Sequence, residues 1–513
     1  MPIDWIALVV FILLFAAITI LGFVAVHWRR GDLALLHEWG LAGGRFGTVI
    51  TWFLLGGDLY TAYTFIAVPA LMFGAGAIAF FAVPYTVMVY PFVFVVFPRL
   101  WSVARRNGYI TASDFVRGRY GSRWLALAIA VTGIVATMPY IALQLVGIQV
   151  VIAGLGVQGV GWVSDLPLVI AFVILAAFTY TSGLRAPAAI AIVKDTLIWI
   201  TVIAAVIVVP IQLGGYDKIF AAIPAAKLLL PPPTSTTLIP YSGYWTLALG
   251  SALALFLYPH AMTGVLSASS RGAISRNAAL LPAYSFLLAL IALLGFMALA
   301  AGVDKAPQFA DFAKAYPRNF AVPALFIAMF PSWFVGVAFA AIAIGALVPA
   351  AIMSIAAANL WTRNIYREFI NPTCTPAQES QMAKWVSLIV KFGALVFIVF
   401  IPLPYAINLQ LLGGILIIQT LPSVVIGLYT RWFHPLALVF GWLIATSAGT
   451  WMFFAVTPPG PTYPLAIFGW TLPCYTALST LVLNFAVAIV LTPIFSVMGA
   501  QRGHDETQVE HYV

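Results

Sequence analysis

Charged side chains inside long apolar segments are the residues of this chain that could do chemistry. Asp58 lies in the stretch Thr51 to Val68, TWFLLGGDLYTAYTFIAV, and Lys194 and Asp195 are adjacent in another apolar stretch. An ionised side chain in hydrocarbon is expensive, and it usually marks the path of a substrate, an ion or a proton. Asp58 and Asp195 are the only two of the fifteen acidic residues that fall well inside such stretches.

Two apolar stretches also carry interruptions of their helical pattern. Gly56 and Gly57 precede Asp58 and weaken helical hydrogen bonding, so we expect that helix to be broken there. The stretch ALGSALALFLYPHAMTGVLSAS is interrupted at Tyr258-Pro259-His260, where the proline removes a backbone donor. Two broken helices at matching positions point to a binding site between them. The alternative is a proline kink and a glycine packing contact that arose independently.

The composition predicts the elements that must position these residues. With 63% hydrophobic and 8% charged residues, the chain differs from soluble globular proteins, in which about 25% of residues are charged. Apolar runs of about 20 residues recur from end to end, as in helices that span a bilayer. We therefore predict an all-α polytopic membrane protein with thirteen spans, at 4–26, 48–73, 78–98, 125–155, 166–182, 187–213, 241–265, 278–302, 332–361, 384–402, 406–429, 435–455 and 473–497.

The loop charges predict the orientation of these spans. The first span is too long for a signal-peptide core, so we expect it to remain as an anchor. With the N-terminus outside and the C-terminus cytoplasmic, seventeen of the 24 Lys and Arg residues face the cytoplasm and five face outside. We expect a multi-pass protein of the plasma (inner) membrane of a bacterium, with Cys374 and Cys474 on opposite sides and therefore not disulfide-bonded. The net charge of +9 reflects this loop bias and is not evidence for nucleic-acid binding.

The order of the spans predicts an internal symmetry. After an N-terminal extra helix at 4–26, spans two to six (48–213) and seven to eleven (241–429) form two sets of five. Because five is odd, the two sets have opposite orientations, which is the inverted-repeat arrangement of many secondary transporters. Two C-terminal helices (435–497) and a cytoplasmic tail (498–513) complete a single transmembrane domain, 1–513, and we expect a monomer to suffice for transport.

At these residues the chain resembles the sodium:solute symporter family. That family has the five-plus-five inverted-repeat fold of the leucine transporter, with one extra helix in front, and the resemblance is closest to bacterial monocarboxylate permeases. The similarity covers most of the chain. It is carried by Gly56-Gly57-Asp58, Ser182-Gly183-Leu184-Arg185-Ala186, Leu257-Tyr258-Pro259-His260 and Ala350-Ala351-Ile352-Met353-Ser354.

The resemblance also implies a coupling-ion site. In sodium-coupled members one sodium ion lies between the first broken helix and the ninth span. Its expected ligands in this chain are three carbonyls and one hydroxyl, from Gly56, Leu59, Ala351 and Ser354. However, Ile355 stands where the family has a second Ser or Thr, and Ala191 where sugar- and proline-transporting relatives carry an Asp. The site has therefore lost an oxygen ligand and a nearby negative charge.

Lys194 follows Ala191 by one helical turn and is followed by Asp195. It could project its ammonium to the place of the ion, as in proton-coupled members of the same fold superfamily. A lysine that gains and loses a proton during the cycle can couple transport to the proton gradient. The alternatives are a static ion pair, with Asp58 or Asp195, and direct contact with a substrate carboxylate. Lys391 has no motif around it, and we expect it to snorkel or to pair.

The expected substrate is a small anion, because half-helix N-termini direct N–H groups at carboxylates. Asp58 could instead cap the half helix, and His260 could be an ordinary packed histidine. Gly56, Gly57 and Pro259 are the expected hinges. The candidate substrate-binding residues are Gly57, Asp58, Tyr60, Tyr63, Tyr140, Gln144, Tyr258 and His260.

These patterns together predict a symporter that imports lactate, pyruvate, acetate, propionate or a similar monocarboxylate by alternating access. A proton is favoured over sodium as the coupling cation, and no other cofactor is expected. The alternatives are a sodium-coupled symporter of an amino acid or other small solute, and a transporter-like sensor or channel. The chain has no HExxH or GxSxG motif, and its six His residues are scattered, so an enzyme is not expected.

Overall fold

Most of the chain forms helices that pair their backbone groups internally, as apolar segments in a bilayer must. The computed structural model describes residues 1–513 except 29–30, 62, 158–165 and 401–405. The side chains of residues 63, 397–400, 406–407 and 409 are also outside the described part. Its long helices are α1 (Trp5–Val24), α5 (Ala82–Asn107), α7 (Arg123–Gly154), α8 (Leu166–Ser182), α9 (Arg185–Leu213), α15 (Pro282–Ala300), α18 (Ser332–Trp361), α19 (Pro376–Phe400), α22 (Pro435–Ala455) and α23 (Thr476–Val497).

Shorter helices complete the membrane-embedded part and its connections. They are α2 (Leu36–Leu41), α3 (Thr48–Leu59), α4 (Val68–Ala75), α6 (Ala112–Tyr120), α10 (Tyr216–Ala222), α11 (Ala225–Leu228), α12 (Ser242–Leu255), α13 (Pro259–Leu266), α14 (Arg271–Leu280), α16 (Ala310–Ala315), α17 (Ala321–Met329), α20 (Ala406–Ile417) and α21 (Leu421–Val424). A π-helix at Tyr63–Ala67 leads into α4. Two strands, β1 (Thr462–Ile467) and β2 (Trp470–Tyr475), form an antiparallel hairpin.

Each predicted span coincides with a helix or a run of helices, but the count of thirteen is not confirmed. Within the described residues, nine helices are long and apolar enough to cross a membrane, or ten if a bent pair counts as one span. One of the nine, Thr64–Asn107, joins parts of two predicted spans. The hairpin was not predicted, and residues 473–475 of the last predicted span belong to β2.

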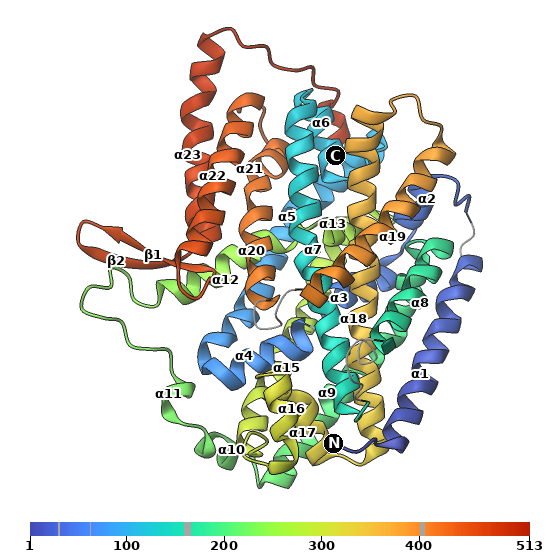
Figure 1. Ribbon diagram of the computed structural model, residues 1–513. Coiled ribbons are helices and arrows are strands. Elements are labelled where there is room, and N and C mark those ends of the chain that lie inside the picture. The colour runs from blue at the N-terminus through green and yellow to red at the C-terminus, as the bar shows by residue number, and fades with distance from the viewer. Residues whose placement is uncertain (29–30, 62, 158–165, 401–405) are drawn as a thin grey trace.

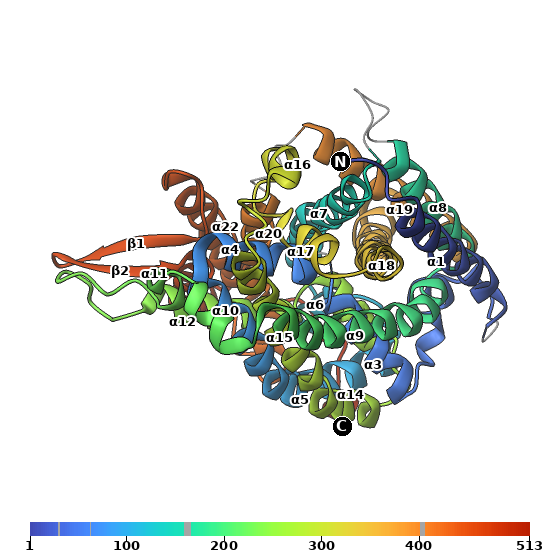
Figure 2. The same cartoon turned by 90° about the horizontal axis from the view of Figure 1, so that it is seen from below.

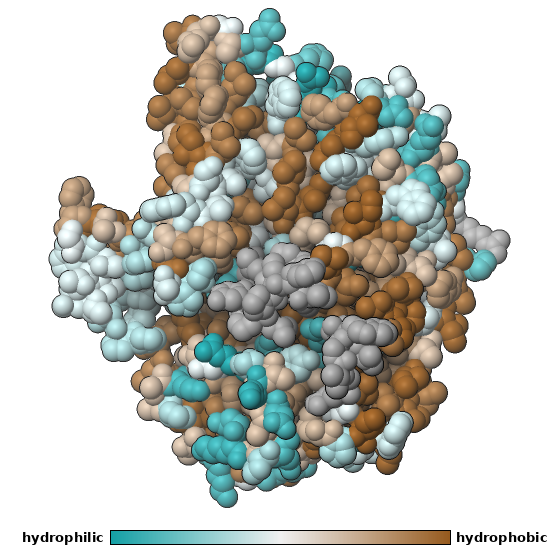
Figure 3. Space-filling model, in the orientation of Figure 1, coloured by the Kyte–Doolittle hydropathy of each residue, from teal (hydrophilic) through white to brown (hydrophobic). Residues whose placement is uncertain are grey.

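Helix α18 forms the centre of the molecule. It packs against α1, α7, α9, α13 and α19 and is buried along most of its length. Figure 2 shows it nearly end-on among these helices. The outer helices α1, α22 and α23 instead expose large apolar side chains such as Trp5, Trp451 and Val490. Figure 3 shows apolar side chains over α22 and α23 at the upper left, which suits contact with lipid.

The first broken helix is interrupted later than the sequence predicted. Helix α3 continues through Gly56, Gly57 and Asp58 and ends at Leu59, with the Tyr60 amide still donating to the Gly56 carbonyl at 2.9 Å. The prediction of a break at the glycine pair was therefore wrong by a few residues. An isolated glycine pair lowers helix propensity, but packing against α9 and α15 keeps it helical. The second break agrees with the prediction, since α12 and α13 meet at 48° around Tyr258.

The motif that opens α9 is explained by contact with α2. Gly183 has a φ of +57°, and a Cβ there would lie 2.2 Å from the Trp39 carbonyl oxygen. The next amide, of Leu184, donates to that same carbonyl at 2.9 Å. Buried Arg185 then donates to the carbonyl of Glu38 at 2.7 Å and to its carboxylate at 2.5 Å. The glycine permits this close approach, and the ion pair fixes the start of α9.

The two termini lie at opposite ends of α7 (Figure 1). The Asp4 amide donates to Leu155 at the end of α7, whereas the tail docks beside α6, where Asp505 pairs with Arg119 at 2.8 Å and with Arg431 at 2.9 Å. Opposite ends are what an odd number of crossings requires. Which end faces the cytoplasm stays a prediction.

Single-cysteine labelling tests that orientation. We expect Phe468→Cys, at the fully exposed tip of the hairpin, to react with a membrane-impermeant maleimide in right-side-out vesicles. Cys374 should react only in inverted vesicles, because the predicted topology places it in the cytoplasm. Each probe is placed in a background that lacks the other natural cysteines. The reverse labelling pattern would show that the orientation is inverted.

Candidate cation and substrate site

Lys194 lies against the C-terminal end of α3. Its Nζ, fully buried on α9, donates hydrogen bonds to the carbonyls of Gly57 and of Tyr60, the latter at 3.0 Å. The last carbonyls of a helix have no partner within the helix and carry the negative end of its dipole. The ammonium therefore satisfies carbonyls that would otherwise be free to bind a cation.

A carboxylate and a phenol complete this cluster. The Asp195 Oδ1 lies 3.1 Å from the Lys194 Nζ, and the Tyr284 hydroxyl of α15 donates to Asp195 Oδ2 at 2.5 Å. Lys194 and Asp195 are both fully buried. A buried charge persists only when it is paired and hydrogen-bonded, and this cluster supplies both conditions.

The glycine pair of α3 makes room for the cluster. A Cβ at Gly57 would lie 3.1 Å from the Lys194 Nζ and 3.2 Å from both carboxylate oxygens of Asp195. A Cβ at Gly56 would lie 2.2 Å from the ring of Tyr284, which also packs on Tyr60 with ring centroids 4.8 Å apart. In this structure the two glycines allow close approach, and the break lies beyond them.

A second group of side chains gathers at the start of α13. His260, in its first turn, has its Nε2 3.9 Å from the Asp58 Oδ2, and its ring lies 5.3 Å from those of Tyr140 and Tyr258. Among the described residues, the side-chain nitrogens of His260 and the carboxylate oxygens of Asp58 have no hydrogen-bond partner. Buried polar atoms are normally paired, so these atoms are available to a ligand.

The structure thus divides the predicted substrate residues into two groups. Asp58, Tyr140, Tyr258 and His260 lie together, whereas Gly57 and Tyr60 belong to the lysine cluster. Gln144 is buried one turn beyond Tyr140 and donates to its carbonyl at 3.2 Å. The side chain of Tyr63 lies outside the described residues.

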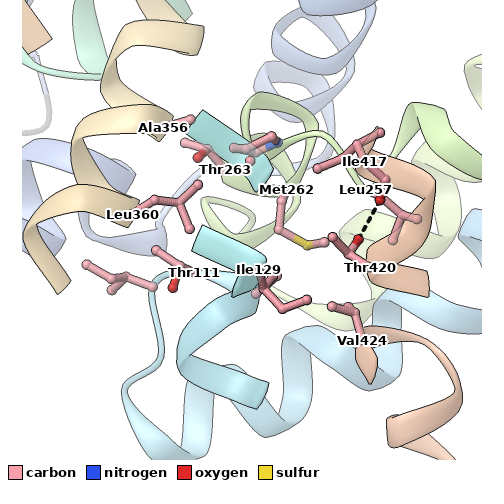
Figure 4. A pocket seen from close by; sticks show the side chains of 14 residues that line it. Thr111, Ile129, Leu257, Met262, Thr263, Ala356, Leu360, Ile417, Thr420 and Val424 are labelled. Atoms are coloured by element: carbon pink, nitrogen blue, oxygen red, sulfur yellow. Dashed lines mark hydrogen bonds between the residues drawn. The ribbon is translucent and has the colours of Figure 1, made fainter. Parts of the chain in front are cut away.

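Two pockets flank the break between α12 and α13. One extends from the break toward α6 (Figure 4). Met262 and Thr263 of α13 line it together with Ile129, Leu360 and Thr420, and Leu257 and Pro259 form its wall at the break. The other lies between α12, α20 and β2, with Tyr258 and Gln410 in its lining. The residues around Tyr258 therefore separate two hollows.

Each predicted sodium ligand makes a hydrogen bond within the protein. The carbonyls of Gly56 and Leu59 accept hydrogen bonds from the Tyr60 amide and the Thr64 hydroxyl. The pair that faces the Lys194 ammonium, Gly57 and Tyr60, is one residue further along the chain. On α18, the Ser354 hydroxyl donates to the Ala351 carbonyl at 2.8 Å. Ile355 and Ala191 are fully buried and offer no side-chain oxygen.

Two contributors were not predicted from the sequence. Tyr284 binds Asp195, and Ser387 of α19 donates to Ser354 at 3.1 Å. Each is an ordinary residue in an apolar span without a motif around it, so no sequence signal distinguishes it. Their importance comes from helices that are distant in sequence and adjacent in space.

Comparisons with known proteins show the family and the fold of this chain. The model of the sodium:solute symporter family matches residues 39–434. A protein of Rhizobium johnstonii described as a monocarboxylate transport permease is 52% identical, over 95% of this chain and 96% of its own. The uncharacterized symporter YodF of Bacillus subtilis is 32% identical, over 94% and 93%. The solved structure of a Na⁺-coupled sialic acid symporter aligns with a TM-score of 0.76 at 14% identity, over 96% of this chain and 98% of its own.

The glycine contacts predict a steric mutation effect. We expect the added methyl group of Gly56→Ala to displace Tyr284. Overpacking lowers the stability by about 1–3 kcal/mol, which exceeds the gain of about 1 kcal/mol that alanine brings in helix propensity. The melting temperature of the purified protein in detergent should therefore fall. Gly47→Ala at the start of the same helix is the matched control, since nothing lies within 4 Å of a Cβ there. Equal melting temperatures for the two variants would contradict the packing argument.

Proposed function

The chain belongs to the sodium:solute symporter family, and from that premise we propose that it imports small monocarboxylates with a coupling cation, a proton in preference to sodium. A single observation carries the choice of cation: the Lys194 ammonium lies on the end carbonyls of the first broken helix. An ammonium that is hydrogen-bonded to two carbonyls supplies the positive charge that a bound metal cation would supply. Its loss of a proton would remove that charge without the departure of an ion.

The neighbours of Lys194 support a residue that changes its protonation state. Asp195 stabilises the ammonium at 3.1 Å, and the Tyr284 hydroxyl holds that carboxylate in place at 2.5 Å. When the ammonium loses its proton, the α3 carbonyls lose their hydrogen-bond donor and Asp195 loses its counter-charge. The end of α3 is then free to move, which links proton release to the conformational change.

The second break supports an anionic substrate. Helix α13 begins at Pro259, so the amides of its first turn have no partner inside the helix and attract a carboxylate. The imidazole of His260 and the hydroxyls of Tyr140 and Tyr258 belong to the same region, beside apolar surface. A compact acid such as lactate, pyruvate, acetate or propionate matches these groups. The similarity to the Rhizobium relative, which is described as a monocarboxylate transport permease, supports the same substrate class.

Alternating access follows from the position of the second break between two pockets. Tyr258 lines one pocket, where its hydroxyl donates to the Gln410 carbonyl at 3.2 Å, while Pro259 lines the other. A rocking motion of the broken helices against α7 and α18 would open one pocket as it closes the other. Pro259 and the unwound residues after Leu59 are the expected hinges.

Sodium coupling is the alternative that the site keeps open. Ser354 and the Ala351 carbonyl lie 2.8 Å apart on α18 and could contribute two oxygens to a sodium ion. In that case the Lys194 cluster is a static support for α3. The substrate could then be an amino acid or another small solute.

Uptake by proteoliposomes separates these possibilities. We expect an imposed proton gradient alone to drive accumulation of radiolabelled lactate, and Lys194→Ala to reduce it by about a hundredfold, the scale of lost proton-transfer function. Lys384→Ala on α19, a partly exposed lysine, should behave as wild type. Accumulation that requires a sodium gradient and survives the loss of Lys194 would establish the alternative.

The substrate assignment has its own test. His260→Ala should raise the KM for lactate exchange by about tenfold, because a buried donor to a carboxylate is lost, with little change in the maximal rate. His504→Ala in the C-terminal tail is the control. An unchanged KM would show that His260 is a packed residue that does not contact the substrate.

A further inference from the structure

A second buried lysine is connected to α18 by a chain of hydroxyl groups. Lys391 of α19 is 1% exposed, so the expectation that it snorkels to the surface was wrong. Its Nζ donates to the Ser387 hydroxyl at 2.7 Å, and Ser387 donates to the Ser354 hydroxyl at 3.1 Å. Ser354 in turn donates to the Ala351 carbonyl at 2.8 Å. The chain therefore ends on the two α18 oxygens of the predicted cation site.

No acidic side chain in the described part of the chain pairs with Lys391. Helix α18 has no ionisable residue, while α7 has only Arg123 and Tyr140, and α8 only Tyr180. The charged residues of 362–370 contact the opposite end of α19, where Arg363 and Arg367 pair with Glu379. Their partner Glu379 lies twelve residues before Lys391, about 18 Å away along the helix.

The charged and ionisable groups of the other neighbouring segments are also distant in the helix. The Ser380 hydroxyl donates to the Leu33 carbonyl, and α2, which carries His37 and Glu38, packs against α19 near its first turns. Lys384 is two turns before Lys391 and lies over the ring of Tyr180. A charged ammonium at Lys391 would thus lack a counter-ion, a costly state inside a membrane protein.

The hydrogen bonds of the hydroxyl chain can run in either of two directions, and the protonation state of Lys391 determines which. With an ammonium, each group donates toward α18, so Ser354 and the Ala351 carbonyl are occupied. With a neutral amine, the nitrogen lone pair can accept from Ser387, and the chain can reverse and release the Ala351 carbonyl. Lys194 lies on the carbonyls next to the predicted α3 ligands, those of Gly57 and Tyr60, and this chain occupies the α18 half of the predicted cation site.

We propose that Lys391 is a second proton-carrying residue of the transport cycle, acting through Ser387 and Ser354 on the α18 half of the cation site. The inference rests on the proposed proton-coupled symport. In each cycle one N–H bond of the ammonium breaks, the nitrogen keeps the electron pair, and the proton passes to a water molecule admitted when the site opens. The reverse transfer, from water on the other side, restores the ammonium.

The test compares accumulation with exchange in proteoliposomes. Accumulation of labelled lactate under a proton gradient requires net proton movement, whereas exchange of labelled for unlabelled lactate without a gradient does not. We expect Lys391→Met and Ser387→Ala to reduce accumulation by about tenfold or more while exchange stays within about twofold of wild type. Lys384→Met, the same substitution two turns earlier on α19, should leave both rates unchanged.

The outcomes separate this proposal from the proposed function. Wild-type accumulation by Lys391→Met would overturn the role of Lys391 and leave proton-coupled symport intact. If Lys391→Met loses exchange as well, Ser387→Ala decides: selective loss of accumulation supports the proposal, and any other result overturns it. Absence of lactate exchange in the wild type would overturn the proposed function, and the role of Lys391 with it.

Discussion

The contact between the Lys194 ammonium and the end carbonyls of α3 is the interaction on which the rest of the site depends. It requires α3 to end at Leu59, so that its carbonyls are free, and it is favoured by Gly57, because a Cβ there would lie only 3.1 Å from the Lys194 Nζ. Asp195 of α9 balances the charge of the ammonium, and the Tyr284 hydroxyl of α15 donates to that carboxylate. Three helices, α3, α9 and α15, meet at this one nitrogen atom and its counter-ion. A change in its charge therefore affects all of them at once.

The buried charges also suggest why the chain can dispense with part of a sodium site. A bound sodium ion would join α3 to α18 through shared oxygens. Here the Gly56 and Leu59 carbonyls accept from the Tyr60 amide and the Thr64 hydroxyl, and Lys194 binds the neighbouring carbonyls at the end of α3. The α18 oxygens are satisfied by hydroxyls that lead to Lys391. Each half of the predicted site is therefore self-contained. The loss of a hydroxyl at Ile355 is compatible with this arrangement, since the α18 half no longer needs to complete a coordination shell.

Sequence reasoning identified the family, the helical fold, Lys194, and the break at Tyr258, because each leaves a local signal: a motif, apolar runs, a charge in hydrocarbon, a proline in a helix. It misplaced the first break, since glycine propensity was weighed without the packing of Tyr284 against Gly56. It could not find Tyr284, Ser387 or the β hairpin. Tyr284 and Ser387 depend on contacts between distant helices, which leave no local signal, and the end of the hairpin, residues 473–475, falls within the last predicted span. Of the two expectations for Lys391, snorkelling failed for the same reason, because only the fold shows which face of its helix is covered.

The geometry of α3 links the two groups of functional residues. Successive residues of a helix point about 100° apart, so Gly57 and Asp58 face different neighbours. Gly57 contacts the Lys194 cluster, while the Asp58 carboxylate lies 3.9 Å from His260 at the candidate substrate site. One turn of α3 thus contacts both groups of residues, and a displacement of that turn alters both contacts together. Because a rigid backbone transmits the motion within a single turn, the proposed coupling would need no direct contact between the proton and the substrate.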